Sequence, residues 1–384
     1  MEIQIINLSL NDVFKQFSNE YKIYRDIYLP GLFGLEIRSL DDEHARNLQT
    51  IVLNSNEICY KSDNSEKNLC NIFIHGTLRS LKETARKVLT NGADDLGYKI
   101  NSFIKNYEEY DTKTYNFGNK AFSFDKSYIM GILNVTPDSF SDGGKYINTN
   151  NAVAHALEMI ADGADIIDIG AESTRPGSES VAAEEEIRRL IPVIDGILTE
   201  KPDTIISVDT TKSKVAECTL SHGAKIINDI SAFNFDPQII EAVKKFDAGY
   251  VLMHMQGTPG NMQNNPKYEN LIKEIYDFLY EKLLILNKYG IKETIIDPGV
   301  GFGKSVDDNF KILKRLEDFK SLGSPILIGV SRKTFIGKTL NLEVTERDTA
   351  TAAVEAIAVK NGAKIIRTHN VKYGSQICKL LNHL

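Results

Sequence analysis

Along residues 128–384, short apolar segments alternate with longer segments in which apolar residues recur at a helical period. This alternation is typical of successive βα units, in which each buried parallel strand is followed by a helix that covers the sheet. The predicted strands are Tyr128–Leu133, Asp165–Ile169, Thr204–Val208, Lys225–Asn228, Gly249–Met253, Thr294–Ile296, Pro325–Gly329 and Lys364–Ile366. The helices expected between them include Ala152–Asp162, Glu184–Leu198, Lys212–Ser221, Tyr268–Tyr289, Asn309–Phe319 and Arg347–Lys360.

Three Gly-Ala pairs, at 163–164, 223–224 and 362–363, stand directly before predicted strands. This is where glycines that end helices are expected. Eight consecutive units over roughly 250 residues match a closed (β/α)8 barrel in number and length. A doubly wound open sheet is the alternative, and the count of consecutive units favours closure.

The first third of the chain has a different pattern, with fewer clear elements. Strands are expected at Gly34–Arg38 and Asn71–Ile74, and helices at about 42–53 and 78–89. A polar and aromatic connector, Asn116–Ser127, separates this region from the repeated units. The sequence therefore predicts a small α/β or α+β domain over residues 1–120, followed by the barrel over residues 121–384.

Composition narrows the class of protein. The 384 residues are 42% hydrophobic and 25% charged, as in an ordinary globular protein. A net charge of -7 argues against a general nucleic-acid binder. Four scattered cysteines without a CxxC pair suggest reduced thiols and a cytoplasmic location. The N-terminus shows no secretory signal pattern, and no apolar run approaches the ~20 residues that span a bilayer.

An unusual loop follows the first predicted barrel strand. The strand stops at Asn134, and the loop beyond it carries Asp138, Ser139, Asp142 and two glycines. An ordinary connection needs turn residues, but no amide at the strand tip with two acids beyond it. A solvated turn with a structural Asn is the alternative, and the ends of the other strands help to decide between the two.

Polar side chains follow every predicted strand. In a barrel the carboxyl ends of the strands and the loops after them form the active-site mouth. A purely structural barrel has little reason to gather polar groups there, because buried polar groups are costly unless paired. In strand order the groups are Asn134, Glu172–Gly177, Asp209-Thr210, Asn228-Asp229, Met253–Gly257, Asp297–Lys304, Ser331–Lys333 and Arg367–Asn370.

Two kinds of chemistry are present at these ends. Asp209, Asn228 and Asp297 can donate to and accept from the edge of a flat, nitrogen-rich heterocycle. A helix N-cap for Asp209 and a turn before Pro298 for Asp297 are the structural alternatives. A second group of side chains supplies positive charge for a phosphate or pyrophosphate, although each could be a solvated surface cation. These are Arg175, Arg332, Lys333, Arg367 and His369.

Two further signals are weak. Gly301–Lys304 lacks the full spacing of a Walker phosphate loop, and Phe302 within it is interpreted as an aromatic wall. His254 stands between two methionines and is interpreted as a core histidine rather than a ligand.

From about Tyr128 to the C-terminus, some two thirds of its length, the chain carries eight motifs in a fixed order. They are GILNVTPDSFSDGG (131–144), ESTRPG (172–177), SVDT (207–210), IND (227–229), MHMQGTP (253–259), IDPGVGFGK (296–304), GVSRK (329–333) and RTHNV (367–371). In these motifs and their order the chain resembles bacterial dihydropteroate synthases. One departure is Ala171, where the family commonly has a second glycine, and it affects loop geometry more than activity.

The resemblance implies condensation of 6-hydroxymethyl-7,8-dihydropterin diphosphate with 4-aminobenzoate, giving 7,8-dihydropteroate and diphosphate in folate synthesis. It also implies Mg2+, a homodimer formed through barrel helices, and competition between sulfonamides and 4-aminobenzoate. The residues that it implies for the pterin pocket are Asp209, Asn228, Asp297 and Lys333, with Thr174 at the pterin diphosphate.

The remaining implied roles belong to the other parts of the site. Asn134 binds Mg2+, while Arg367 and His369 hold the diphosphate. Phe140 and Asp142 complete the site as the first two loops close over it. The aminobenzoate side is shaped by Ser331, Phe302, Arg175 and Pro176. The residues expected to be catalytic are Asp209, Lys333, Asp142, Arg367 and His369.

Elementary chemistry agrees with these roles. The bond to diphosphate can break first, because the pterin ring stabilises a cation at the exocyclic carbon, so charge stabilisation matters more than a strong base. The aromatic amine is neutral at pH 7 and needs orientation more than activation. A methyltetrahydrofolate methyltransferase acting with a corrinoid protein is one alternative, but it has no use for a diphosphate clamp. A catalytically silent pterin-binding protein is the other.

Overall fold

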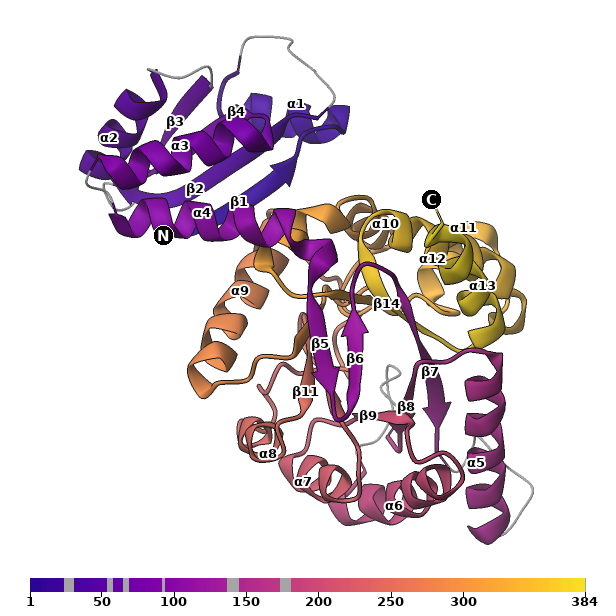
Figure 1. Cartoon of the computed structure of the whole chain (residues 1–384). Helices are drawn as coiled ribbons and strands as arrows, with labels where there is room; N and C mark the ends of the chain where they lie inside the picture. Colours follow the sequence, from indigo (N-terminus) through magenta and orange to yellow (C-terminus); the bar gives the residue numbers. More distant parts are fainter. Residues whose placement is uncertain are drawn as a thin grey trace. The chain divides into compact units, whose positions relative to one another are not determined.

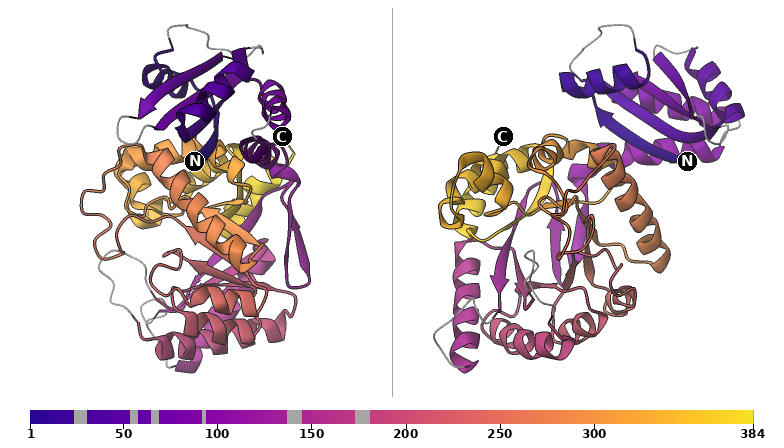
Figure 2. Two further views of the ribbon diagram at one scale, coloured as in Figure 1. Left: turned by 90° about the vertical axis from the view of Figure 1, so that its left-hand side faces the viewer. Right: turned by 180° about the vertical axis from the view of Figure 1, so that it is seen from behind.

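The computed structural model describes residues 1–23, 31–53, 58–64, 69–91, 94–136, 145–172 and 181–383. Within these ranges the chain forms two compact units, and Figure 1 and Figure 2 show their elements coloured along the sequence. The first unit comprises Met1–Tyr110 with Glu317–Gly323, and the second comprises Asp111–Leu316 with Ser324–Leu384. The domain boundary predicted after residue 120 stays a prediction.

The first unit contains a four-stranded antiparallel sheet with four helices, which agrees with the small α+β domain expected from the sequence. The strands, in sheet order, are β1 (Glu2–Asn7), β2 (Phe33–Asp41), β4 (Leu69–Gly76) and β3 (Ile58–Asn64). The helices are α1 (Asn11–Glu20), α2 (Asp42–Leu53), α3 (Leu78–Thr90) and α4 (Asp94–Glu108).

Helix α3 illustrates why these segments fold locally. Thr77 caps its N-terminus, because the side chain accepts a hydrogen bond from the backbone of Ser80. Leu81, Ala85 and Val88 follow at helical spacing and are buried, so one face of the helix packs inward.

The second unit is built on a closed barrel of eight parallel strands. Closure is made by β14 and β7, where Thr368 lies opposite Gly131, so the open-sheet alternative is wrong. The strands are β7 (Tyr128–Asn134), β8 (Ile166–Gly170), β9 (Ile205–Asp209), β10 (Ile226–Asp229), β11 (Gly249–Met253), β12 (Thr294–Asp297), β13 (Ile326–Ile328) and β14 (Ala363–Thr368).

Helices follow the strands around the outside of the barrel, as Figure 1 and Figure 2 show. They are α5 (Lys145–Asp162), α6 (Ala183–Glu200), α7 (Ser213–Ser221), α8 (Ile239–Lys245), α9 (Leu271–Tyr289), α10 (Val306–Lys314), α11 (Thr334–Leu340), α12 (Asp348–Lys360) and α13 (Val371–Leu381). Short 3₁₀ turns are formed by Tyr110–Thr112, Leu316–Leu322 and Val344–Glu346. In the described part of the chain, no helix has the length and apolarity that a membrane crossing requires.

Glycines end three of the helices as the sequence predicts. Gly163, Gly223 and Gly362 have φ values of 106°, 105° and 106°, in the region that favours glycine. Each brings the chain from the end of a helix into the start of the next strand. Three of the βα units therefore share the same helix-to-strand connection.

A hairpin, β5 (Thr114–Phe117) and β6 (Lys120–Ser123), precedes the first barrel strand. Its aromatic side chains Phe117 and Phe122, with Phe124 just beyond, are buried in one cluster with residues of all eight barrel strands. The cluster includes Tyr128 and Ile166 at the starts of their strands. The hairpin therefore fills the amino end of the barrel, opposite the strand ends at which the sequence predicts the site.

Candidate active site

The barrel register brings the predicted strand-end residues into one row. Asn134 lies opposite Gly170, Gly170 opposite Asp209, and Asp209 opposite Asn228. Asp297 ends β12 opposite Met253. The carboxyl ends of parallel strands meet at one end of a barrel, so these side chains border a single mouth.

Arg367 is held between two carboxylates at this mouth. Its Nε donates to Asp168 Oδ2 at 2.6 Å, and its Nη2 donates to Asp209 Oδ2 at 2.9 Å. Asn228 Nδ2 donates to the same oxygen of Asp168 at 3.0 Å. Within the described residues, Nη1 of Arg367 has no hydrogen-bond partner, so one edge of the guanidinium remains available to a ligand.

Burial dominates the electrostatics of this group. It raises the pKa of Asp209 to about 7, although the Arg367 guanidinium opposes the shift, and the charges of Asp168 and Asp229 add to it. The nearby acids outnumber the cation that binds them. A positively charged ligand beside Asp209 would therefore favour its ionised form. The helix-cap alternative for Asp209 is not what the geometry shows, because the N-cap of α7 is Lys212.

Asp297 and Lys333 form the second part of the mouth. Asp297 is 8% exposed, and its Oδ1 accepts the backbone N–H of Gly299 at 2.7 Å, so the turn named above as its structural alternative is present. Burial raises the pKa of Asp297, while the charge of Lys333 lowers it. Burial lowers the pKa of Lys333 to about 8, and Asp297 opposes this shift. The two residues are thus electrostatic partners.

The β12–α10 loop supports Lys333. The Lys333 ammonium donates to the backbone carbonyl of Val300 and lies 4.3 Å from the centre of the Phe302 ring. The Phe302 ring thus lies beside Lys333, and its role as an aromatic wall stays a prediction. Lys304 is turned inward to His254, with Nζ 2.8 Å from Nδ1, so this segment is not a phosphate loop. His254 is buried, as interpreted from the sequence.

Ser331 and His369 meet beside the mouth. Ser331 Oγ accepts the backbone N–H of His369 at 3.1 Å and lies 2.9 Å from its ring Nδ1. Arg332, considered above as a phosphate-binding cation, instead forms two hydrogen bonds to Asp348, at 2.6 and 2.9 Å. Its charge is thus matched within the protein.

Asn134 offers an amide oxygen at the tip of β7. The side chain has no hydrogen-bond partner among the described residues. Its Oδ1 lies 3.9 Å from the point where a Gly170 side chain would begin, and Asp209 Cβ lies 3.5 Å from that point. No group of three or more His, Cys, Asp or Glu residues that could hold a metal is found in the described ranges.

Five predicted residues lie outside the described residues: Phe140, Asp142, Thr174, Arg175 and Pro176. The second loop begins just after Glu172, which the structure describes. The Lys212 ammonium binds both Glu172 and Glu186, and Thr210 Oγ1 donates to Glu186 Oε2 at 3.1 Å.

Asp168 is the site residue that sequence reasoning missed. It stands inside the apolar run Ile166–Gly170 and is 0% exposed. A charged residue within a buried strand is rare unless it is paired, and that signal was available. Its partners come from β10 and β14, so its role becomes visible only with the barrel register.

The fold and the mouth together define a barrel enzyme for a flat, polar heterocycle that carries an anionic group, and comparisons with known proteins agree. Residues 130–369 match the family model described as pterin binding enzyme. A curated dihydropteroate synthase from Synechocystis sp. is 43% identical over 262 residues, which cover 67% of this chain and 90% of that protein.

Solved structures give the same result. A Yersinia pestis dihydropteroate synthase in a sulfonamide drug complex is 38% identical, with a TM-score of 0.67, and the match covers 71% of this chain and 98% of that one. A Xanthomonas albilineans dihydropteroate synthase with 4-aminobenzoic acid is 38% identical, with a TM-score of 0.66 and the same coverage. The chain therefore belongs to the dihydropteroate synthase family of pterin-binding enzymes, which are transferases of folate biosynthesis.

Proposed function

We propose that this chain condenses 6-hydroxymethyl-7,8-dihydropterin diphosphate with 4-aminobenzoate to give 7,8-dihydropteroate and diphosphate. The observation that carries the proposal is the pairing of Arg367 with Asp168 and Asp209 beside Asn228, in the mouth of a barrel of this family. These side chains provide buried acids for a pterin and a guanidinium edge for its diphosphate.

The pterin binds along Asp209, Asn228 and Asp297, with Lys333 beside them. Carboxylate and amide groups match the alternating donors and acceptors on the edge of a pterin ring. The acids are buried, so a hydrogen bond to either is worth more than it would be in water. Thr174 joins this pocket by the family resemblance alone.

The leaving diphosphate is held by Arg367 and His369. The two carboxylates fix the guanidinium plane, and its Nη1 edge can donate to a phosphate oxygen without losing either ion pair. Ser331 orients the imidazole of His369 through its 2.9 Å contact with Nδ1. Loss of diphosphate leaves a cation delocalised into the pterin ring, which Asp209 stabilises.

The aromatic amine then attacks the exocyclic carbon to form the new C–N bond, and the resulting ammonium loses one proton to the released diphosphate or to solvent. Phe302 and Ser331 bound the 4-aminobenzoate side, and Arg175 and Pro176 join them by resemblance. Orientation by these residues matters most, because the amine is already neutral. Phe140 and Asp142 are proposed to help exclude water, which would otherwise capture the cation.

The residues at the mouth fit Mg2+. This ion prefers oxygen ligands and usually keeps several waters, binding one or two protein groups together with substrate phosphates. Asn134 offers such an oxygen without a competing hydrogen bond in the described part of the chain. When bound, Mg2+ supplies charge neutralisation to the leaving diphosphate.

The reaction is tested by incubating the protein with the pterin diphosphate, with and without 4-aminobenzoate. Release of diphosphate and formation of dihydropteroate only when both substrates are present support the synthase. Methyl transfer from methyltetrahydrofolate would support the corrinoid-dependent alternative. Binding of the pterin diphosphate without turnover would support the silent pterin-binding protein. A sulfonamide should raise the apparent KM for 4-aminobenzoate, because the two compounds compete for one pocket.

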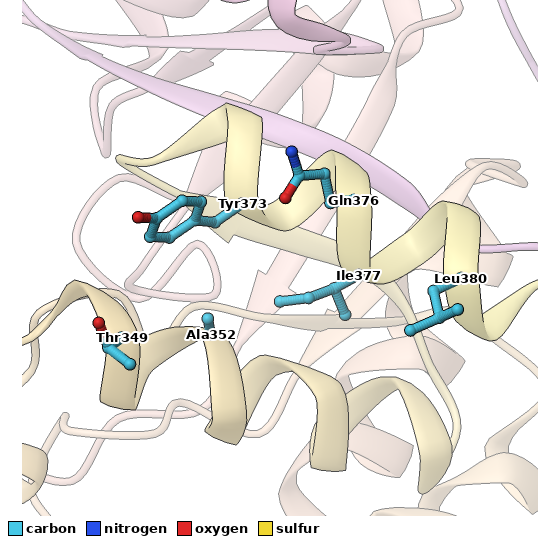
Figure 3. A pocket seen from close by; sticks show the side chains of 6 residues that line it. All are labelled: Thr349, Ala352, Tyr373, Gln376, Ile377 and Leu380. Carbon is cyan, nitrogen blue, oxygen red and sulfur yellow. The ribbon is translucent and has the colours of Figure 1, made fainter.

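The face formed by α12 and α13 supports a homodimer. A groove of about 370 Å3 runs between these helices and is lined by Thr349, Ala352, Tyr373, Gln376, Ile377 and Leu380. In Figure 3, Ile377 and Leu380 point toward α12, and Ala352 points back toward α13. Leu380 of α13 and Ile357 of α12 are 66% and 53% exposed, and a second copy of this chain would cover them. The free thiols of the four cysteines support a cytoplasmic location.

A further inference from the structure

A buried lysine joins the β12–α10 loop to the segment that follows strand β11. Lys304 is 3% exposed, and its Nζ lies 2.8 Å from His254 Nδ1, 3.0 Å from the carbonyl oxygen of Phe302 and 3.2 Å from that of His254. As an ammonium, Nζ donates three hydrogen bonds; as a neutral amine, it donates two and accepts one from the imidazole. In either protonation state, the three contacts use the full hydrogen-bonding capacity of Nζ. Lys304 therefore acts on the protein and not on a ligand.

The same two segments touch directly at two glycines. A Cβ on Gly299, where φ is 72°, would lie 1.8 Å from the carbonyl oxygen of His254. A Cβ on Gly303, where φ is 65°, would lie 2.5 Å from the carbonyl oxygen of Gln256. The loop is thus pressed against residues 254–256, and Lys304 bonds both sides of this contact.

The other side of the loop carries part of the active site. The carbonyl of Val300 accepts from Lys333, and the Phe302 ring lies beneath the same ammonium. A Cβ on Gly301 would lie 2.7 Å from Lys333 Cδ, so the lysine stem runs closely along the loop. Any shift of this loop moves the Lys333 ammonium and the aromatic wall together.

We propose that Lys304 and His254 are a positioning pair for the condensation reaction. The pair holds loop 298–303 against residues 254–256. It thereby positions Lys333 and Phe302 toward the two substrates without contacting either substrate. The inference rests on the proposed function, because that function gives Lys333 and Phe302 their tasks.

Two kinds of substitution distinguish the effect of the Lys304–His254 hydrogen bond from the effects of side-chain size and charge. Lys304→Met keeps the length of the side chain but makes no hydrogen bond. His254→Leu removes the imidazole, whereas His254→Asn keeps an amide group near the position of Nδ1. The exposed neighbour Lys311 provides the matched control, Lys311→Met. Melting temperatures first establish that each variant folds.

We expect Lys304→Met and His254→Leu to lower kcat/KM for the pterin diphosphate by roughly tenfold to a hundredfold, because misplacing a site by about 1 Å can cost that much. His254→Asn and Lys311→Met should stay close to wild type. The double variant Lys304→Met/His254→Leu should lose no more kcat/KM than Lys304→Met alone, because both substitutions remove the same interaction.

A pH profile distinguishes positioning from general stability. Burial gives Lys333 a pKa of about 8, and a displaced loop admits water to it. The alkaline limb of kcat/KM should therefore move to higher pH in Lys304→Met. A folded Lys304→Met protein with wild-type kcat/KM overturns the proposal, as do additive losses in the double variant. If Lys304→Met does not fold, equal activity of His254→Asn and His254→Leu overturns it. A wild-type protein that makes no dihydropteroate would instead refute the proposed function.

Discussion

Arg367 Nε lies 2.6 Å from Oδ2 of Asp168, a carboxylate that is entirely buried inside strand β8. The two residues are 199 positions apart in the sequence. Their pairing joins the second strand of the barrel to the last, with Asn228 of the fourth strand bonded to the same oxygen. Asp168 thus sets the direction in which the guanidinium presents its free edge.

Asp168→Ala should destabilise the protein. The change leaves Arg367 Nε and Asn228 Nδ2 without their acceptor, and removing one partner of a buried ion pair costs about 3–5 kcal/mol. The remaining bond to Asp209 should keep the loss near the lower end of that range. Urea unfolding measures it, and Asp168→Asn, which retains one acceptor oxygen, serves as the milder control. Equal stability of Asp168→Ala and wild type would contradict this role.

Asp209→Asn should reduce turnover far more than it alters folding. The amide keeps the shape of the carboxylate and an acceptor for Arg367 but loses the charge that stabilises the pterin cation. We expect kcat to fall roughly a hundredfold, as for the loss of other electrostatic stabilisers. Steady-state kinetics measures the change, and the exposed Asp203→Asn provides the control. Near-normal turnover would refute the cation role.

Lys333 should impose an alkaline limit on activity. Its pKa is lowered to about 8, so the ammonium is present below that pH and is lost as pH rises through it. kcat/KM for the pterin diphosphate should accordingly fall above about pH 8. Lys333→Arg keeps the charge at higher pH, so the fall should disappear even if the rate is lower. Lys338→Arg, at an exposed position, should leave the limb unchanged. Persistence of the limb in Lys333→Arg would assign it to another group.

Glu355 of α12 should make stability depend on pH. It is 1% exposed, and neither oxygen has a hydrogen-bond partner within normal distance among the described residues. Burial raises its pKa from 4.5 to about 7, although the nearby Thr368 hydroxyl opposes the shift. The folded state therefore binds the proton more tightly than the unfolded state does. The cost of ionisation is absent below pH 4.5, grows as pH rises toward 7, and is fully present above 7.

Glu355→Gln removes that cost. At pH 8 it should stabilise the protein by about 1–3 kcal/mol, because each pKa unit corresponds to roughly 1.4 kcal/mol. At pH 4 the gain should vanish. Denaturant unfolding at both pH values measures the difference, with the exposed Glu281→Gln as control. A destabilised Glu355→Gln protein at pH 8 would mean that the carboxylate has a partner in solution.

Leu380→Lys should separate the proposed dimer. The side chain is 66% exposed in a single chain, and a charge there would be buried in the assembly without a partner. Light scattering should then give the mass of one chain, 43.0 kDa, instead of twice that value. Leu284→Lys, at an exposed position on α9, should leave the dimer intact. A monomeric wild-type protein would refute the assembly.

Much of the barrel could be predicted because each strand is a short apolar run and glycines mark the ends of three helices. The strand Gly249–Met253 was predicted with its observed bounds, and the three Gly-Ala joints were identified correctly. The β5–β6 hairpin was interpreted as a connector, because its outward residues are polar and only its inward aromatics reveal its role. The helices for which the sequence gives no prediction are α1, α4, α8, α11 and α13.

The site was less readable, because it depends on register. Arg332 and Arg367 both follow barrel strands, and only the structure shows that Arg332 is neutralised by Asp348 while Arg367 faces the mouth. Lys304 looked like part of a weak phosphate motif, and its direction toward His254 could not be read from spacing. The partner toward which each of these side chains points decides its role, and local sequence patterns do not encode that partner.

Because the hairpin aromatics fill the amino end, the barrel is closed at that end and is open only at the carboxyl ends of its strands. Whatever enters must leave by the rim through which it came. Bound dihydropteroate would block the binding of the next 4-aminobenzoate. Product release must therefore precede substrate binding, because both use the same entrance.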